Sequence, residues 1–365
     1  MRRLLPSLLA LIVLCSSCAR SEVKRLVTAA APEPFPVPIV ELRGSPADIA
    51  AAHARQLGEP IRNLFGAYFG RYFENALQRN MAMLAATAFE GKLLPEHRAV
   101  VIELAHDVGL DERQVMLGQC FLDLSEMTAC STITLPASAS PDHVARFGRN
   151  LDFPSFDVAD KSTVLMIVHP NDHYAFASIA WPGMMGVLSG MNEHGLTLAN
   201  MEVDRGRRMP TAMPYTLLYR TVLERCKTVD EAIALLQSTP RQTANNLMLM
   251  DAAGGRAVVE ITPESVAVRR GNEVAALIST NHQRGADADT GGRCDRYDYL
   301  HDAAAKRFGR INVASVETML GHVGQGRMTL QSMVFEPVNR IIYLAVGENA
   351  PTRGYHELDL TGYFH

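Results

Sequence analysis

The sequence lacks several features that would point to common functional classes. The net charge is −4 and no long basic run occurs, so binding to a nucleic acid has no electrostatic basis. None of the 12 histidines lies in an HExxH motif or accompanies a serine in GxSxG, which excludes the usual zinc peptidases and serine hydrolases. No repeat of fixed period is present. The composition, 47% hydrophobic and 20% charged over 365 residues, is typical of a globular protein with one large or two ordinary domains.

The first residues have the features of an export signal. Two arginines precede an apolar stretch from Leu4 to Cys15, which is too short to span a bilayer but suits the apolar part of a signal peptide. The following run, Ser16-Ser17-Cys18-Ala19, resembles a bacterial lipobox, although that pattern prefers Leu, Val or Ile where Cys15 stands. We therefore expect a lipidated Cys18; ordinary signal cleavage and an uncleaved anchor are the alternatives.

This leader predicts where the protein resides. Residues 1–18 would direct export to the periplasmic side of a bacterial membrane, and a lipid on Cys18 would hold the protein there. Residues 19–44, rich in proline, would form an extended tether. The protein would then be attached to a membrane without being embedded in it.

Four cysteines remain after residue 18, and they differ in context. Cys120 and Cys226 lie in apolar helical stripes and are expected in the core. Cys294 stands between two charged residues and lacks the context of a nucleophile. Four cysteines in so long a chain make no disulfide scaffold, although an exported protein is able to pair them. No CxxC spacing occurs among the four, so structural zinc is not expected.

The periodicity of the chain changes at Cys130. From Ser45 to Leu124 apolar residues recur every three or four positions, which predicts helices. From Cys130 onward, short β-prone segments separated by turn residues predict strands, with two helices near residues 215–237 and two more over 293–322. We expect an α+β protein in which a helical segment precedes a strand-rich body.

Five motifs in order resemble one family. They are MTACSTI, FGRNLDF, GMNEHGL, STNHQ and CDRYDYL. Together they are similar to the autoproteolytic cysteine acyltransferases and hydrolases, which belong to the N-terminal nucleophile hydrolases. Isopenicillin N acyltransferase is the best-known member, and acid ceramidase and the conjugated bile salt hydrolases carry related patterns. The resemblance covers nearly all of the chain after about Gly44.

Cys130, in the first motif, is the expected nucleophile. An internal cysteine thiol has a pKa near ~8.5 and is mostly protonated at neutral pH. If the bond between Ala129 and Cys130 breaks, the new α-amine, with an ordinary pKa of ~8, lies on the same residue as the thiol. One residue then supplies both nucleophile and general base. The alternative is a buried structural cysteine.

Arg149 and Asp152 are expected to assist Cys130. The carboxylate of Asp152 would orient the α-amine in its ammonium form, and the Arg149 guanidinium would favour the thiolate. Strand alternation places residues three apart on opposite faces, so we expect Asp152 to lie past the end of its strand. The alternative is a surface ion pair.

The resemblance also assigns the remaining candidate site residues. Asn281 matches the asparagine that stabilises the oxyanion, and Asn200 is a weaker candidate for the same task because a small offset in the matching would displace it. Arg296 matches an arginine that supports the site or binds an anionic group, with a helix-surface arginine as the alternative. The segment from Asn192 to Gly195 is expected to be a turn.

The resemblance implies a fold and a maturation path. We expect a four-layer αββα sandwich over residues 130–365. Residues 45–129 would form a helical propeptide that stays associated after cleavage at Ala129–Cys130. No metal or organic cofactor is required.

The expected reaction is hydrolysis of a linear acyl amide through a thioester on the cysteine. Phe153, Trp181 and Met184 are candidates for an acyl pocket, although apolar residues of this kind are equally suited to a core. Two alternatives remain: transfer of the acyl group to an amine, and a lipoprotein that keeps the fold, binds a ligand and never cleaves itself.

Overall fold

Two β-sheets and eight helices make up the part of the chain that the computed structural model describes, residues 35–125, 129–203, 211–285 and 292–365. The larger sheet has the order β1-β4-β5-β6-β7-β8-β9-β10 and the smaller one β11-β2-β3-β12-β13-β14. All pairings within the sheets are antiparallel except that of β1 with β4. Among the described residues, none of the helices is long and apolar enough to cross a membrane.

The elements follow the chain in this order. The strands are β1 (Ile39–Gly44), β2 (Ala129–Leu135), β3 (Arg146–Asp152), β4 (Val164–Pro170), β5 (Phe176–Ala180), β6 (Ser189–Asn192), β7 (Thr197–Glu202), β8 (Asn245–Met250), β9 (Arg256–Ile261), β10 (Val266–Arg270), β11 (Leu277–Ser279), β12 (Thr329–Glu336), β13 (Ile341–Val346) and β14 (His356–Asp359). The helices are α1 (Pro46–Tyr72), α2 (Ala76–Thr87), α3 (Pro95–Val108), α4 (Glu112–Leu124), α5 (Tyr215–Arg225), α6 (Val229–Ser238), α7 (Asp295–Arg307) and α8 (Val313–Val323).

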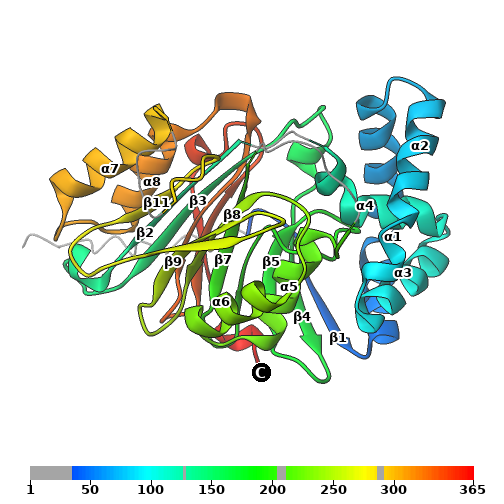
Figure 1. The fold of residues 1–365 in the computed structure, drawn as a ribbon, viewed down its shortest axis with the longest axis horizontal. Coiled ribbons are helices and arrows are strands. Elements are labelled where there is room, and N and C mark those ends of the chain that lie inside the picture. Colours follow the sequence, from blue (N-terminus) through cyan, green and yellow to red (C-terminus); the bar gives the residue numbers. More distant parts are fainter. Residues whose placement is uncertain (1–34, 126–128, 204–210, 286–291) are drawn as a thin grey trace, which may run out of the picture. The chain divides into compact units, whose positions relative to one another are not determined.

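The sheets form the two inner layers of a sandwich. Arg149 of β3 donates from Nε to Ser189 Oγ of β6 at 3.1 Å, and Thr132 of β2 contacts Met201 of β7, so these side chains lie between the sheets. Helices α5 and α6 pack on the large sheet, and α7 and α8 pack on the small one (Figure 1). The predicted αββα arrangement is therefore confirmed.

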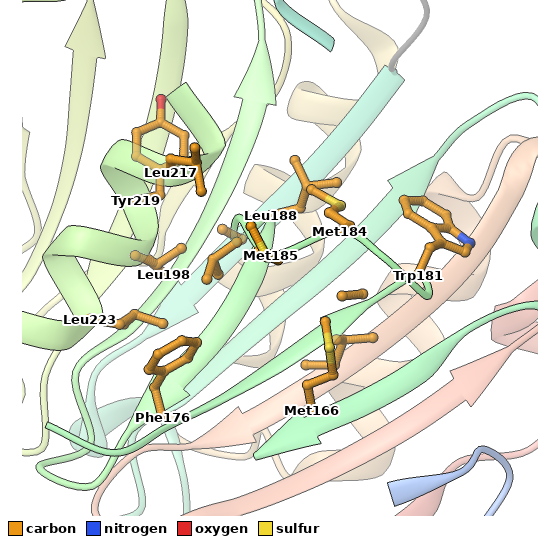
Figure 2. Packing of buried hydrophobic residues seen from close by; sticks show 14 of the residues in the cluster. Met166, Phe176, Trp181, Met184, Met185, Leu188, Leu198, Leu217, Tyr219 and Leu223 are labelled. Carbon is orange, nitrogen blue, oxygen red and sulfur yellow. The ribbon is translucent and has the colours of Figure 1, made fainter. Parts of the chain in front are cut away.

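An apolar core joins the large sheet to its helices. Leu198 of β7 lies in one cluster with Leu217 and Leu223 of α5, and Met184 and Met185 from the segment after β5 belong to the same cluster (Figure 2). Buried apolar area of this kind stabilises the folded state by about 25 cal/mol per Å². The position of the sheet against α5 is thereby fixed.

The helices before Cys130 begin and end where local signals place them. Ser45 caps α1, since its hydroxyl accepts from the Asp48 N–H while the Asp48 carboxylate accepts from the Ser45 N–H. Helix α3 begins at Pro95 and ends at Gly109, which has a φ of 69°. The predicted helical segment is confirmed, with α2 as a separate helix within it.

One predicted boundary is wrong. The tether was expected to reach residue 44, but Ile39–Gly44 forms strand β1, which pairs in parallel with β4 at the edge of the large sheet. Val40 and Leu42 are buried while Glu41 and Arg43 are exposed, which is the alternation of a half-buried strand. The adjacent prolines concealed this pattern. The other predicted features of the leader, Cys18 included, lie outside the described residues.

Candidate active site

Cys130 is the second residue of β2, a central strand of the small sheet. Its backbone N–H donates to Asn281 Oδ1 at 2.7 Å, and its carbonyl accepts from Arg296 Nη1 at 2.5 Å. The side chain is completely buried in this uncleaved chain. The Ala129–Cys130 bond is intact and belongs to the strand, in which Ala129 pairs with Asp152. Cleavage would turn this backbone nitrogen into an α-amine, and the nitrogen is already hydrogen-bonded to Asn281.

Arg149 and Asp152 flank Cys130 from two sides of the small sheet. Arg149 pairs with Thr132 and extends between the sheets to Ser189, whereas Asp152 lies on the face that carries α7 and α8. The expectation that Asp152 lies past the strand end is wrong, because Asp152 is the last residue of β3. Strand alternation holds and separates the two side chains. Both charges nevertheless influence the pKa of the Cys130 thiol, which lies near the end of β2.

Asp152 is a buried carboxylate with polar partners. Thr329 Oγ1 donates to its Oδ1 at 2.5 Å, and Arg296 Nη1 lies 3.9 Å from its Oδ2. Burial raises the pKa of Asp152 to about 6, against the opposing effects of Thr329, Arg296 and Arg149. A register shift in β12 between Thr329 and Gln331 brings Thr329 opposite Asp152.

The thiol of Cys130 is held mainly in its protonated form in the uncleaved chain. Burial raises its pKa, the Arg149 guanidinium opposes that rise, and the Asp152 carboxylate adds to it. Arg149 is itself fully buried beside the thiol. Its positive charge is the strongest influence that favours a thiolate.

Asn281 and Arg296 complete the cluster from the segment after β11 and from α7. Asn281 Oδ1 also accepts from Arg296 Nη2 at 3.1 Å, and its Nδ2 donates to the Glu202 carbonyl at 2.8 Å. Arg296 also donates to Ser131 Oγ at 3.1 Å. One amide and one guanidinium therefore tie Cys130 to β7 and α7. The structure brings Cys130, Arg149, Asp152, Asn281 and Arg296 together.

Asn200, the second oxyanion candidate, is not brought to this cluster. Met201 and Ala199 share a face of β7 that is directed toward the small sheet, as the contact of Met201 with Thr132 shows. Strand alternation then directs Asn200 to the opposite face, toward the helices. Its placement corrects that prediction. By contrast, Asn192 and Gly195 form the expected turn, in which the Asn192 Oδ1 accepts from two backbone N–H groups.

An apolar cleft lies beside the end of β3. Its volume is about 520 Å³ when the open solvent at its mouth is included. The predicted residues Phe153, Trp181 and Met184 line it, and the Phe153 and Trp181 ring centroids are 5.3 Å apart. The rest of the lining comes mostly from α1 and α4: Leu64, Phe65, Tyr68, Phe69, Gly118, Phe121 and Leu122, with Ala159 and Pro182 from the body. Phe153 directly follows Asp152, so the cleft begins next to the polar cluster.

The other cysteines contrast with Cys130. Cys120, Cys226 and Cys294 are all buried and unpaired in disulfides. Burial raises the pKa of Cys226 to about 11. Arg225 and Glu231 lie near Cys226 and act on its pKa in opposite directions, but the described residues place no arginine that is fully buried, as Arg149 is, beside it. Within the described ranges, no group of three or more His, Cys, Asp or Glu side chains is suited to a metal ion.

Several site contacts were not anticipated from the sequence. Thr329 bonds Asp152 across 177 positions, and Ser189 bonds Arg149 across 40. Ser131 directly follows Cys130 in the sequence, and this adjacency was the only local indication of its hydrogen bond to Arg296. Glu202 contributes its carbonyl to Asn281. Nothing in their local sequence distinguishes Thr329 or Ser189, since register alone brings them to the site.

Comparison with known proteins gives a family match, a sequence relative and several solved structures. Residues 139–319 match the sequence model of the family described as acyl-coenzyme A:6-aminopenicillanic acid acyl-transferase. The chain is also 31% identical over 119 residues to the N-acylethanolamine-hydrolyzing acid amidase of Oryctolagus cuniculus, a stretch that covers 30% of this chain and 32% of that relative. The chain thus spans about a third of the length of the curated relative that it matches.

Two of the solved structures that match the chain come from different organisms. One is the N-acylethanolamine-hydrolyzing acid amidase ortholog of Caenorhabditis elegans, with a TM-score of 0.47 and 18% identity over 57% of this chain and 93% of that one. Another is the conjugated bile acid hydrolase of Clostridium perfringens, with a TM-score of 0.46 and 18% identity over 64% of this chain and 93% of that one.

Proposed function

We propose that this chain, whose residues 139–319 match the model of the acyl-coenzyme A:6-aminopenicillanic acid acyl-transferase family, is a self-cleaving cysteine amidohydrolase of the N-terminal nucleophile type. Cys130 is its nucleophile and a linear acyl amide is its substrate. The observation that carries the proposal is the bond from the Cys130 backbone nitrogen to Asn281, with Arg149, Asp152 and Arg296 around it.

Maturation is an attack of Cys130 on the residue before it. The thiol sulfur bonds to the Ala129 carbonyl carbon, the Ala129–Cys130 C–N bond breaks, and the thiol proton passes to the nitrogen. Water then hydrolyses the thioester, which leaves a carboxylate on Ala129 and a free α-amine on Cys130. Because the thiol is fully buried before cleavage, access for another substrate depends on this break in the chain.

Catalysis repeats the same chemistry on an external amide. The thiol attacks the carbonyl carbon, with the α-amine as its general base, and an amide hydrogen of Asn281 stabilises the oxyanion. The α-amine then protonates the leaving amine, and water releases the acyl group. Among the described residues, Asp152 Oδ2 accepts no hydrogen bond. It is therefore available to accept a hydrogen bond from the Cys130 α-amine when that amine is protonated.

The cleft supports an apolar acyl group as the substrate's main feature. Its lining is almost entirely aromatic and aliphatic, and it begins beside Asp152 at the reacting end. An acyl chain there removes apolar surface from water, which stabilises binding by about 25 cal/mol per Å². We also propose that the protein is exported and lipidated at Cys18. Outside the cytosol acyl-CoA donors are absent, so hydrolysis is preferred over acyl transfer.

The N-terminal segment is expected to remain bound after cleavage. Strand β1 belongs to the large sheet, and the buried side chains of His53 in α1 and Gln119 in α4 form hydrogen bonds with the body. Asp123 Oδ1, for example, accepts from Gln242 Nε2 at 2.8 Å. Separation would expose these groups and the apolar cleft to water.

Product analysis of an acyl anilide series tests the proposed reaction. Purified protein should release free acid and aniline, with longer acyl chains preferred, and Cys130→Ala should release none. Cys130→Ser should act slowly, because a hydroxyl is the weaker nucleophile at neutral pH. A competing amine separates transfer, which forms a new amide, from hydrolysis. Full activity of Cys130→Ala, or acyl-amide binding by a permanently intact chain without turnover, would contradict the proposal.

A further inference from the structure

We propose that Asn246 is a positioning residue that holds Asn281 in place for both self-cleavage and turnover; this inference rests on the proposed function. Asn246 is the second residue of β8 in the large sheet and is fully buried. Asn281 belongs to the segment after β11 in the small sheet. The contact between them therefore crosses from one sheet to the other.

The contact is a clamp on both sides of Asn281. Asn246 Nδ2 donates to the Thr280 carbonyl at 2.9 Å and to the His282 carbonyl at 2.9 Å. Both partners are carbonyl oxygens, which only accept, so the amide nitrogen must face them and the side chain cannot be flipped. Both hydrogens of the amide are thus used on the two residues that flank Asn281.

The register of the large sheet explains why Asn246 is able to reach this segment. Asn246 pairs with Met201, whose side chain lies between the sheets against Thr132. Cross-strand partners share a face, so Asn246 also extends between the sheets. Its neighbour Asn245 lies on the opposite face of β8 by alternation.

The position of Asn281 decides the chemistry around Cys130. Its Oδ1 bonds the Cys130 nitrogen and Arg296, and its Nδ2 bonds Glu202. Those bonds fix the amide itself, whereas the clamp fixes the backbone from which it extends. Without the clamp, two buried carbonyls lose a donor, and the segment is expected to shift to satisfy them. A displacement of about 1 Å in a catalytic group costs on the order of 100-fold in rate.

Asn246→Ala and Asn246→Ser test this role, with Asn245→Ala and Asn245→Ser as matched controls. Asn245 is the adjacent residue and is equally buried, and neither of its side-chain polar atoms has a hydrogen-bond partner among the described residues. The Asn246 variants should cleave themselves more slowly and show kcat lower by about 10- to 100-fold, with KM within about twofold of wild type. The Asn245 variants should match wild type in kcat.

The outcomes distinguish failure of the Asn246 role from failure of the proposed function. If the Asn246 variants fold, cleave and turn over like the Asn245 variants, the clamp has no positioning role. If Asn246→Ala does not fold, Asn246→Ser, which keeps a hydroxyl donor, supplies the comparison. A fall in thermal stability without a fall in kcat also overturns the inference. If wild type itself neither cleaves nor turns over substrate, the proposed function fails first and this role fails with it.

Discussion

The helical segment before Cys130 and the sandwich after it contribute differently to one site. The sandwich holds Cys130, Arg149, Asp152, Asn281 and Arg296, so every group proposed to act on the reacting atoms belongs to it. The helical segment supplies no such group but forms most of the apolar cleft through α1 and α4. If the chain is cleaved as proposed, the groups at Cys130 would belong to one chain and most of the cleft lining to the other.

The two regions meet through the backbone of the segment after β5. Gly183 N–H donates to His53 Nε2 of α1 at 3.2 Å, and its carbonyl accepts from Gln119 Nε2 of α4 at 2.7 Å. Gln119 Oε1 in turn accepts from the Met185 N–H at 2.8 Å. Trp181 and Met184 of this segment line the cleft, so the helices position the body's share of the cleft as well as their own.

The largest effect is expected from a change in the body. Asn281→Ala removes the amide that bonds the Cys130 nitrogen and that we expect to stabilise the oxyanion. Loss of one such donor lowers kcat by about 100- to 1,000-fold. Self-cleavage should slow to a similar extent, which a time course of chain masses after synthesis would measure. Asn80→Ala, at an exposed position of α2, is the control and should behave as wild type. Equal rates of self-cleavage and turnover for the two variants would contradict the assignment of the chemistry to the sandwich.

A change at the junction should affect stability more than chemistry. Burial lowers the pKa of His53 to about 4, and Arg220 adds to this effect. Between pH 6.5 and 4 the unfolded chain binds a proton that the folded chain excludes. His53 therefore destabilises the fold as the pH falls, by up to about 3 kcal/mol near pH 4.

The glutamine substitution at this position isolates that contribution. Gln has a side-chain oxygen that is able to accept from Gly183 and does not titrate. His53→Gln should thus lose less stability than wild type between pH 6.5 and 4 in denaturant unfolding, while kcat at pH 7 changes little. His97, whose pKa burial also lowers, retains its own part of the pH dependence. Parallel unfolding curves for the two proteins across this range would contradict the assignment.

The smallest effect is expected from the shape of the cleft. A Cβ on Gly118 of α4 would lie 2.5 Å from Cζ of Phe65, so the Phe65 ring must move within the cleft. Gly118→Ala should raise KM for long acyl chains by about 3- to 10-fold and leave kcat for short ones unchanged. Gly66→Ala in α1 is the matched control, because its Cβ meets nothing within 4 Å. If KM depends on acyl-chain length in the same way in both variants, the helices have no part in substrate recognition.

The sequence predicted the parts of this molecule that depend on local patterns. Helical periodicity located α3 and α4, and the change of period at Cys130 located the start of the sandwich. The motifs located Arg149, Asp152, Asn281 and Arg296, which the structure gathers around Cys130.

What the sequence did not predict depends on register and on contacts between distant segments. The face that Asn200 occupies follows from the pairing of β7 with its neighbours, which no local signal encodes. Strand β1 looked like tether because its six residues follow prolines, and its burial depends on β4, more than a hundred positions away. The role of α1 and α4 in the cleft was also hidden, since a cleft lining and a core have the same apolar periodicity.

The central claim is that this chain becomes two at Cys130 by its own chemistry. Intact mass spectrometry of purified wild type and Cys130→Ala tests it directly. The account predicts two chains for wild type, copurifying, with the larger beginning at Cys130, and one uncut chain for the variant. A single intact chain for wild type, or the same cut in Cys130→Ala, would contradict it.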